Sequence, residues 1–328
     1  MNKVRYNLLT VSQKKAFVDE YELIFDDALK DNVDKNGDPV KGMENRWQDW
    51  KAKNDTSGKL TETVRELLTA DFDKLVDVFV RFRDLNIPIK NPSNKKERNP
   101  VLKDLDGIFA YANKFDSKIA DHFVKYAERL KITTCHYCEM AFINTYSYVN
   151  DKNLKETRRQ FDIDHFLPKD ECPCVGLSLF NFVPSCQVCN SRIKGDDLPS
   201  EDKNDLLKLS PTSVHADFDN NIAIRLRMIP LDDSALGKRY IYFRTHKPYE
   251  KFVNFFHLEE RYEFHKSEAL RLKKLKERYP DSNIKAIARL LKRREATVRE
   301  DIFQEGFLKR EGRCFQRMTM DILTNRKI

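Results

Sequence analysis

The chain has 328 residues, of which 40% are hydrophobic and 11% aromatic, and this allows two or three domains with a buried core. Nine glycines and twelve prolines exclude a fibrous or low-complexity protein. The net charge of +8 is a small excess of 60 basic over 52 acidic side chains, so its location is more informative than its size. No apolar segment follows Met1, and no run approaches the roughly 18 apolar residues of a membrane-spanning helix, which predicts a cytoplasmic protein without a membrane partner.

Helical periodicity dominates residues 1–131, which we expect to form an N-terminal helical domain. The predicted helices cover 11–31, 60–68 and 71–85, with one or two more within 102–130. Between them, 32–58 is polar and rich in turn residues, although Trp47 and Trp50 could anchor it, and the proline-containing stretch 86–100 is predicted to be a loop. A structural or partner-binding role is favoured for this domain over that of a platform for a catalytic site.

Two Cys-x-x-Cys pairs mark the central region, residues 132–200. Seven cysteines in a reducing compartment argue for metal ligation rather than disulfides, and the odd number leaves at least one free thiol. A pair of thiolates separated by two residues can hold one edge of a tetrahedral zinc ion, and two pairs complete a closed site. The predicted zinc ligands are Cys135, Cys138, Cys186 and Cys189.

Other interpretations of the cysteines are less favoured. The paired spacing disfavours scattered core cysteines, and the 47 residues between Cys138 and Cys186 exceed the spacer of an ordinary zinc ribbon without catalysis. Cys172 and Cys174, in a Cys-Pro-Cys sequence, are interpreted as unligated loop thiols rather than as a second metal site, and Cys314 as buried or inert.

An Asp-His step lies between the two cysteine pairs, at the end of a strand predicted for 161–163. Because a four-cysteine zinc has no open coordination position, chemistry must come from residues between the pairs or just beyond them, namely Asp164, His165 and Asn190. His165 beside a carboxylate fits a general base near its operating pH, provided that the strand twists or ends there so that both side chains face one substrate. Asp162 shares a strand face with Asp164 and is the alternative ligand, and Asn190 could instead cap a helix.

These residues together resemble a known family. The order Asp-His, then Asn181, then Cys-x-x-Cys-Asn-x-x-x-Lys-Gly over 186–195 is similar to the ββα-metal motif of HNH endonucleases that carry a zinc-binding double Cys-x-x-Cys. The resemblance covers about a fifth of the chain. It implies a nuclease core over 132–200, in which the Asp-His step ends the first strand and Asn190 lies on the helix, at the position of the second histidine of the family name.

The resemblance also implies a role for each residue. Asp164 and Asn190 would hold a catalytic Mg²⁺ or Mn²⁺, His165 would be the general base, and Asn181 would brace the loop that orients His165. An asparagine in place of the second histidine favours hard, oxygen-liganded ions such as Mg²⁺. Lys194, one turn beyond Asn190, is expected to contact a phosphate, with a solvated side chain as the alternative.

A narrower resemblance concerns residues 164–169. Their sequence, Asp-His-Phe-Leu-Pro-Lys, is similar to that of HNH proteins found beside ATPases in bacterial anti-phage defence, as in Septu-type and some retron systems. It implies a role in antiviral defence and an ATPase partner.

The C-terminal region, residues 201–328, is predicted to contain a strand pair followed by helices. Alternating apolar residues predict a strand over 220–228, with a second strand at 239–245 and a turn at 232–238. Helices are predicted from about Leu258 onward, with a break at 279–282 where Ser282 would cap the next helix.

Most of the basic excess lies in these helices. Between Arg261 and Glu300, thirteen basic residues stand against six acidic ones, a net charge of +7. Such helices suit phosphate binding because each neutralised phosphate releases counterions, whereas the alternative is a solvated helix face. The clusters expected to bind nucleic acid are Lys273, Lys274 and Lys276, and Lys292, Arg293 and Arg294.

The sequence therefore predicts an α+β, mostly α-helical chain, with a central ββα-metal core and a structural four-cysteine zinc flanked by helical regions. The predicted activity is metal-dependent hydrolysis of phosphodiester bonds in nucleic acid, with DNA favoured over RNA. A single site cuts one strand, so double-strand cleavage needs a homodimer or two successive nicks. The competing interpretation is an inactive zinc-stabilised module that binds nucleic acid or acts as an adaptor in a larger complex.

Overall fold

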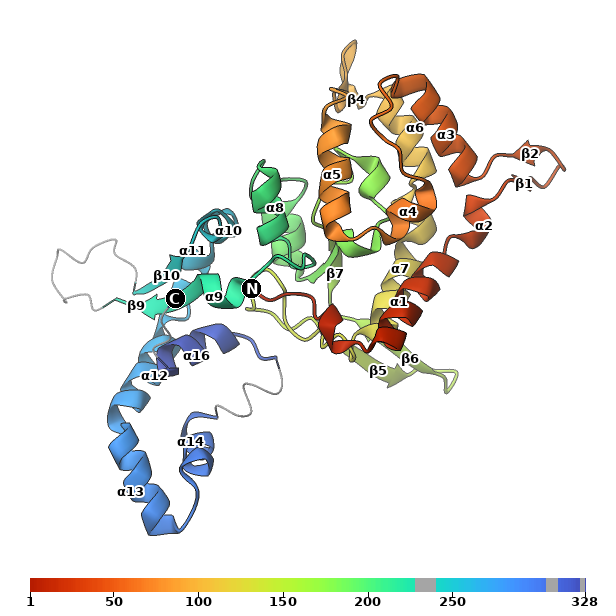
Figure 1. The fold of residues 1–328 in the computed structure, drawn as a ribbon. Coiled ribbons are helices and arrows are strands. Elements are labelled where there is room, and N and C mark those ends of the chain that lie inside the picture. The colour runs from red at the N-terminus through yellow and green to blue at the C-terminus, as the bar shows by residue number, and fades with distance from the viewer. Residues whose placement is uncertain (228–239, 305–311, 325–327) are drawn as a thin grey trace. The chain divides into compact units, whose positions relative to one another are not determined.

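The computed structural model describes residues 1–227, 240–304, 312–324 and 328 (Figure 1). The fold is α+β, with five two-stranded antiparallel sheets among the described residues. None of the described helices is both long and apolar enough to cross a membrane. The chain divides into two compact units, which we call the N-terminal unit (3–132 and 144–216) and the C-terminal unit (1–2, 133–143 and 217–328). The division at residues 131 and 200 stays a prediction.

Helices are the main secondary structure of the N-terminal unit. The α-helices are α1 (Val11–Leu23), α2 (Asp26–Leu29), α3 (Met43–Asn54), α4 (Val64–Thr69), α5 (Phe72–Arg83), α6 (Pro100–Ile108), α7 (Asp116–Tyr126) and α8 (Lys203–Leu209). The short 3-10 and π-helical segments are η1 (Tyr6–Leu8), η2 (Tyr111–Phe115), η3 (Pro173–Val175), η4 (Leu179–Asn181) and η5 (Val188–Lys194). The predicted helices at 11–31 and 102–130 are present, each divided into shorter segments, and the one at 71–85 is α5.

The strands of this unit form four separate hairpins. They are β1 (Asn32–Val33) with β2 (Pro39–Val40), β3 (Lys90–Asn91) with β4 (Asn94–Arg98), β5 (Thr145–Val149) with β6 (Lys155–Arg159), and β7 (Asp162–His165) with β8 (Phe182–Ser185). The second hairpin lies in 86–100, for which the sequence predicts a loop. Its sequence is polar and its strands are exposed, so no alternation of apolar and polar residues marks it.

Side-chain caps fix where several of these helices begin. Thr10 accepts a hydrogen bond from Gln13 N, and the Gln13 side chain accepts one from Thr10 N. Thr63 and Glu66 form the same reciprocal box, so α4 starts at Val64 rather than at residue 60.

Helix α3 lies in the stretch 32–58, where the sequence predicts only a polar, turn-rich segment. Trp47 and Trp50 are buried on one face of α3, with ring centroids 5.3 Å apart. Their indole N–H groups donate to Glu62 O at 2.8 Å and Val101 O at 3.0 Å. Two large buried rings, with Met43 at the start of the helix, thus supply apolar burial that hydrophobic periodicity does not indicate, because most of the other residues of α3 are polar.

A buried histidine lies in the aromatic core of the N-terminal unit. The imidazole of His122 stacks on Phe17, with centroids 4.7 Å apart, and also contacts Tyr21 and Tyr126. Burial among these rings lowers the pKa of His122 from 6.5 to about 4. The side chain is therefore neutral in the folded protein at pH 7.

This burial predicts acid sensitivity of the fold. Unfolding returns His122 to its ordinary pKa, so the unfolded chain binds an extra proton between pH 6.5 and about 4, and the free energy of unfolding falls as the pH falls through that window. A pKa shift of this size lowers the free energy of unfolding by at most about 3 kcal/mol once the pH has fallen below both pKa values. Urea unfolding at pH 7 and pH 5 should show a smaller stability loss in His122→Phe than in the wild-type chain. An equal loss in both would show that His122 does not contribute.

The C-terminal unit contains one described strand pair and a series of helices. Its elements are α9 (Phe218–Asn221), β9 (Ile222–Leu226), β10 (Ile241–Thr245), α10 (Tyr249–Phe255), α11 (Leu258–Glu263), α12 (Lys266–Arg278), α13 (Asp281–Leu291), α14 (Glu295–Phe303) and α16 (Gln316–Thr324). β9 and β10 pair antiparallel, as expected from the alternation at 220–228 and 239–245. The turn predicted at 232–238 lies outside the described residues.

Two predictions for these helices are wrong. The helical series begins with α10 at Tyr249, earlier than the predicted start near Leu258. The break after Arg278 is present, but Pro280 occupies the N-cap position of α13, so Ser282 lies inside the helix and does not cap it. The fixed φ of a proline suits the start of a helix, and with Pro280 as the N-cap α13 starts two residues earlier than it would with Ser282 as the cap.

Candidate metal centre and catalytic site

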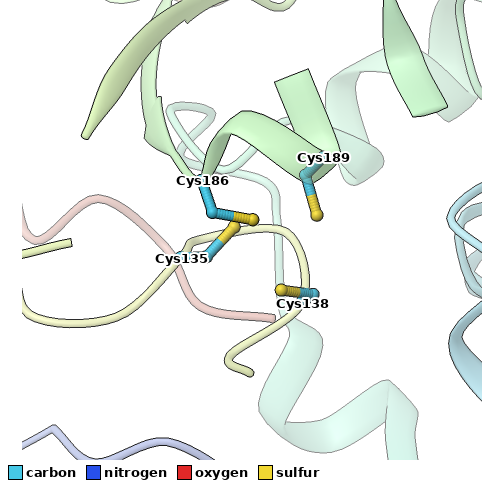
Figure 2. A group of neighbouring side chains, drawn as sticks. All are labelled: Cys135, Cys138, Cys186 and Cys189. Atoms are coloured by element: carbon cyan, nitrogen blue, oxygen red, sulfur yellow. The ribbon is translucent and has the colours of Figure 1, made fainter. Parts of the chain in front are cut away.

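The four predicted zinc ligands lie together. The sulfur atoms of Cys135, Cys138, Cys186 and Cys189 are all within 4.8 Å of one another. Figure 2 shows their side chains pointing toward one another, two from a loop and two from the start of a helical segment. Tetrahedral Zn–S bonds of about 2.3 Å place sulfur atoms about 3.8 Å apart, so the cluster has the dimensions and donor set of a closed zinc site. Such a metal would be structural.

The first cysteine pair sits in a tight turn. Glu139 N donates to Cys135 O at 2.9 Å, and the left-handed conformation of Glu139, with φ 60°, turns the chain directly after the pair. Met140 N donates to Cys138 Sγ at 3.4 Å, a contact that favours the thiolate form of a ligand. The hydroxyl of Tyr262 donates to Cys138 O at 2.7 Å and holds the turn from outside.

Cys172 and Cys174 form a separate thiol pair. Both are buried, and their sulfur atoms are 3.4 Å apart. Burial, together with the hydrogen bond between Cys172 and the Cys174 thiol, raises the pKa of Cys172 well above its usual value. Within the ranges that the structure describes, neither thiol belongs to a group of three or more potential metal ligands, and the interpretation as unligated loop thiols stays a prediction.

The second zinc pair begins the segment that carries Asn190. Strand β7 pairs antiparallel with β8, with Asp164 opposite Val183. β8 continues through Cys186 into η5, where Asn190 N donates to Cys186 O at 3.0 Å. The Asp-His step therefore ends the first of two paired strands, and the second strand leads into the helical segment η5.

Asp164, His165 and Asn190 line one cavity of about 290 Å³. β7 ends at His165, and both members of the Asp-His step contribute to the lining of the cavity. Asn190 Nδ2 donates to Asp162 Oδ2 at 3.2 Å. Asp162 therefore stays a candidate ligand beside Asp164.

The imidazole of His165 is held in one orientation and one tautomer. Its Nε2 lies 2.8 Å from Gly176 O, which can only accept, so Nε2 carries the proton and Nδ1 keeps its lone pair. The rings of Tyr111 and Phe182 meet it edge-on, with centroids 4.5 and 5.0 Å away. Burial lowers the pKa of His165 from 6.5 to about 3, against the hydrogen bond to Gly176. His165 is thus neutral at pH 7, with a pKa lower than the sequence predicts for a base near its operating pH.

Asn181 braces the loop that supports His165. Its side chain is fully buried, accepts from Leu167 N at 2.8 Å and donates to Leu167 O at 3.0 Å and Val175 O at 3.1 Å. These bonds join the segment just after His165 to the residue before Gly176, whose carbonyl orients the imidazole. A single amide thus holds both ends of the loop.

Lys194 does not face a phosphate, contrary to the expectation from the sequence. Its side chain is 1% exposed, and Nζ donates to His165 O at 2.7 Å and lies 3.4 Å from Asp164 Oδ1. The ammonium group thus donates a hydrogen bond to a buried backbone carbonyl and forms an ion pair with a buried carboxylate, which offsets the cost of burying all three groups. Lys194 is therefore a positioning residue of the Asp-His step.

Sequence reasoning missed Tyr111 and the carbonyl of Gly176. Tyr111 lies more than fifty residues before His165 in the sequence, in η2, and no local pattern connects the two. A backbone carbonyl has no sequence signature. The inward direction of Lys194 likewise has no signal in the sequence, because its partners are a carbonyl and a carboxylate about thirty residues earlier in the chain.

No protein-family model, no curated protein and no solved structure matches this chain.

Proposed function

We propose that this chain is a metal-dependent endonuclease of the HNH type, which hydrolyses phosphodiester bonds in nucleic acid. The observation that carries the proposal is that Asp164, His165 and Asn190 line one cavity, in a segment bounded by two cysteine pairs suited to structural zinc. The hairpin of β7 and β8 followed by η5 supports the ββα-metal arrangement that the sequence resemblance implies.

In the proposed reaction, His165 acts as the general base. Nδ1 takes a proton from water, the water oxygen forms a bond to phosphorus, and the bond between phosphorus and the 3′ oxygen breaks. The Nε2–H to Gly176 O hydrogen bond keeps the lone pair on Nδ1 available. Asn181 keeps that carbonyl in place through Val175, so its contribution is positional.

A divalent cation would supply electrostatic stabilisation. Asp164 and the amide oxygen of Asn190 offer two hard oxygen ligands that suit Mg²⁺ or Mn²⁺, which would stabilise charge on the phosphate and on the leaving oxygen. Lys194 holds the Asp164 carboxylate and the His165 backbone together, so the two functional side chains keep a fixed spacing.

One observation favours a second candidate function. The Lys194 ammonium lies 3.4 Å from Asp164 and compensates part of the charge that a cation would otherwise balance. A chain in which this ion pair replaces the cation would be an inactive zinc-stabilised module that binds nucleic acid or acts as an adaptor. Cleavage assays separate the two functions.

The expected nucleic-acid contacts fall into two groups. In the first cluster, Lys273 lies 3.7 Å from Glu277 and Lys276 Nζ donates to Ile322 O at 3.4 Å, so part of the charge is used within the protein. Residues 292–294 of the second cluster are all exposed. Arg293 pairs with Asp301 at 2.5 Å, so each cluster keeps part of its charge within the protein, and we expect both clusters to contribute to binding. DNA as the substrate, a defence role, an ATPase partner and a homodimer stay proposals that rest on the sequence.

His165→Ala is expected to lower the cleavage rate by about 10²–10⁴-fold, the usual contribution of a positioned general base. The zinc content should not change, because His165 is not among the four clustered thiols. Rates of plasmid nicking and elemental analysis on the same preparations check both expectations. A wild-type rate in the variant would exclude His165 as the base.

A further inference from the structure

Helices α13 and α14 are joined by a turn of only three residues, 292–294. Lys292 has φ 53° and ψ 40°, the left-handed conformation that commonly ends a helix, and Arg293 N donates to Ala288 O at 2.9 Å. α14 begins at Glu295. The connection is thus a fixed turn, and Figure 1 shows the chain changing direction there between α13 and α14.

The two helices share a core with their neighbours. Ile284 and Ala288 from α13 pack with Val298 and Phe303 from α14, and the cluster includes Leu272 from α12 and Leu323 from α16. Ala288 is 4% exposed, and its small side chain allows a close helix approach. Two helices held rigidly by packing and joined by a three-residue turn are the elements of a helix-turn-helix, whose second helix enters the major groove of DNA.

Beyond Asp281, the first residue of α13, the charged residues of α13 and the turn are all basic, although Arg293 pairs with Asp301 of α14. From residue 282 to 294 the sequence contains five basic residues and no acidic one. Lys285 and Arg289 are exposed and four residues apart, so they lie on the same face of α13. The exposed Lys292, Arg293 and Arg294 extend the basic surface through the turn.

The first turn of α14 has a different character. Glu295 and Ala296 are exposed there. Arg299, one turn later, pairs with Asp281 at 2.6 Å. A small residue permits close approach to base edges, and a carboxylate can accept a hydrogen bond from cytosine N4. The basic residues of α13 and the turn therefore suit contacts to phosphates, whereas the start of α14 suits contacts to bases.

We propose that α13, the turn and α14 form a helix-turn-helix that binds duplex DNA, with the start of α14 in the major groove. The role of the bound duplex as substrate rests on the proposed nuclease function, whereas the binding itself does not. Duplex RNA is not expected to bind in this way, because its major groove is too deep and narrow to be read. The exposed Leu290 would suit a protein partner instead, but the basic surface favours nucleic acid.

The test uses the full-length, zinc-loaded His165→Ala protein and measures fluorescence anisotropy with labelled oligonucleotides across a salt series. The probes are a short DNA duplex of mixed sequence, its single strand, and the RNA duplex of the same sequence. We expect the DNA duplex to bind most tightly. Replacing Lys285 and Arg289 together by alanine should flatten the slope of log affinity against log salt by roughly 1.8, because each phosphate that is no longer neutralised accounts for about 0.9.

A second pair of variants tests whether α14 enters the groove. Ala296→Trp places a bulky group on the first turn of α14 and should abolish duplex binding, whereas the same exchange at the exposed Ala286 of α13 should not. Both sites are exposed, so both proteins should keep the parent melting temperature. Ala296→Glu, which adds charge with little bulk, repeats the test if the tryptophan variant is unstable.

Three outcomes would overturn the proposal: equal affinity for the DNA and RNA duplexes, unchanged binding in the Lys285/Arg289 and Ala296 variants, or equal loss in Ala286→Trp and Ala296→Trp. Its failure is distinguishable from failure of the nuclease proposal. Wild-type protein that cuts DNA while all these variants bind normally would retain the nuclease and exclude the helix-turn-helix. Protein that binds duplex DNA through α14 but never cuts it would retain the helix-turn-helix and exclude the nuclease.

Discussion

Cys186→Ser is expected to abolish zinc binding and leave the chain largely unfolded or insoluble. Four cysteine sulfur atoms within 4.8 Å of one another form a complete ligand set, and serine removes one vertex. Structural zinc binding contributes about 10–16 kcal/mol in small zinc domains, as much as or more than the roughly 5–15 kcal/mol that separates a folded chain from its unfolded state. Loss of the site therefore affects the whole fold rather than one loop.

Elemental analysis and thermal unfolding check this expectation. Wild-type protein should contain one zinc per chain. Cys314→Ser is the matched control, because it removes a thiol outside the cluster and should keep both the zinc and the melting temperature. Soluble, folded wild-type protein without zinc would contradict the metal centre.

Asp164→Asn is expected to reduce cleavage to background, while Asp162→Asn keeps activity. Asparagine at 164 removes the carboxylate charge for the cation but can still accept a hydrogen bond from Lys194, which lies 3.4 Å away. Alanine is a poorer choice, because an uncompensated buried ammonium costs about 3–5 kcal/mol and would confuse instability with lost chemistry. Nicking rates as a function of Mg²⁺ concentration measure the effect.

The double variant Asp164→Asn with Lys194→Met controls for folding, because it removes both charges of the buried pair. It should be at least as stable as Asp164→Asn alone, and equally inactive. The reverse pattern, with Asp162→Asn inactive and Asp164→Asn active, would show that Asp162 is the metal ligand. The hydrogen bond from Asn190 to Asp162 makes that outcome a specific alternative.

The sequence predicted features that depend on local pattern. The Cys-x-x-Cys spacing predicted the four clustered thiols, and strong apolar periodicity predicted α5. The sequence did not predict α3, whose burial depends mainly on Trp47 and Trp50, in a stretch where most other residues are polar. Periodicity averages over a window and gives little weight to two tryptophans.

The candidate site shows the same division. The order and spacing of Asp164, His165 and Asn190 predicted them as site residues, but the direction of the Lys194 side chain could not be predicted. Its ammonium is buried against the carbonyl of His165 and the carboxylate of Asp164, whereas a lysine in a helical turn is usually solvated. The support of His165 by a backbone carbonyl and by Tyr111 depends on contacts between segments distant in sequence, which no local pattern records.

The most direct test of the nuclease proposal is cleavage of supercoiled plasmid by purified, zinc-loaded wild-type protein. The account predicts conversion to nicked or linear DNA when Mg²⁺ or Mn²⁺ is added, no conversion in EDTA, and recovery when Mg²⁺ is restored in excess. His165→Ala prepared in parallel should be inactive, which excludes a contaminating nuclease. Folded, zinc-containing protein that cuts neither plasmid nor RNA under these conditions, or an equal rate in His165→Ala, would contradict the account.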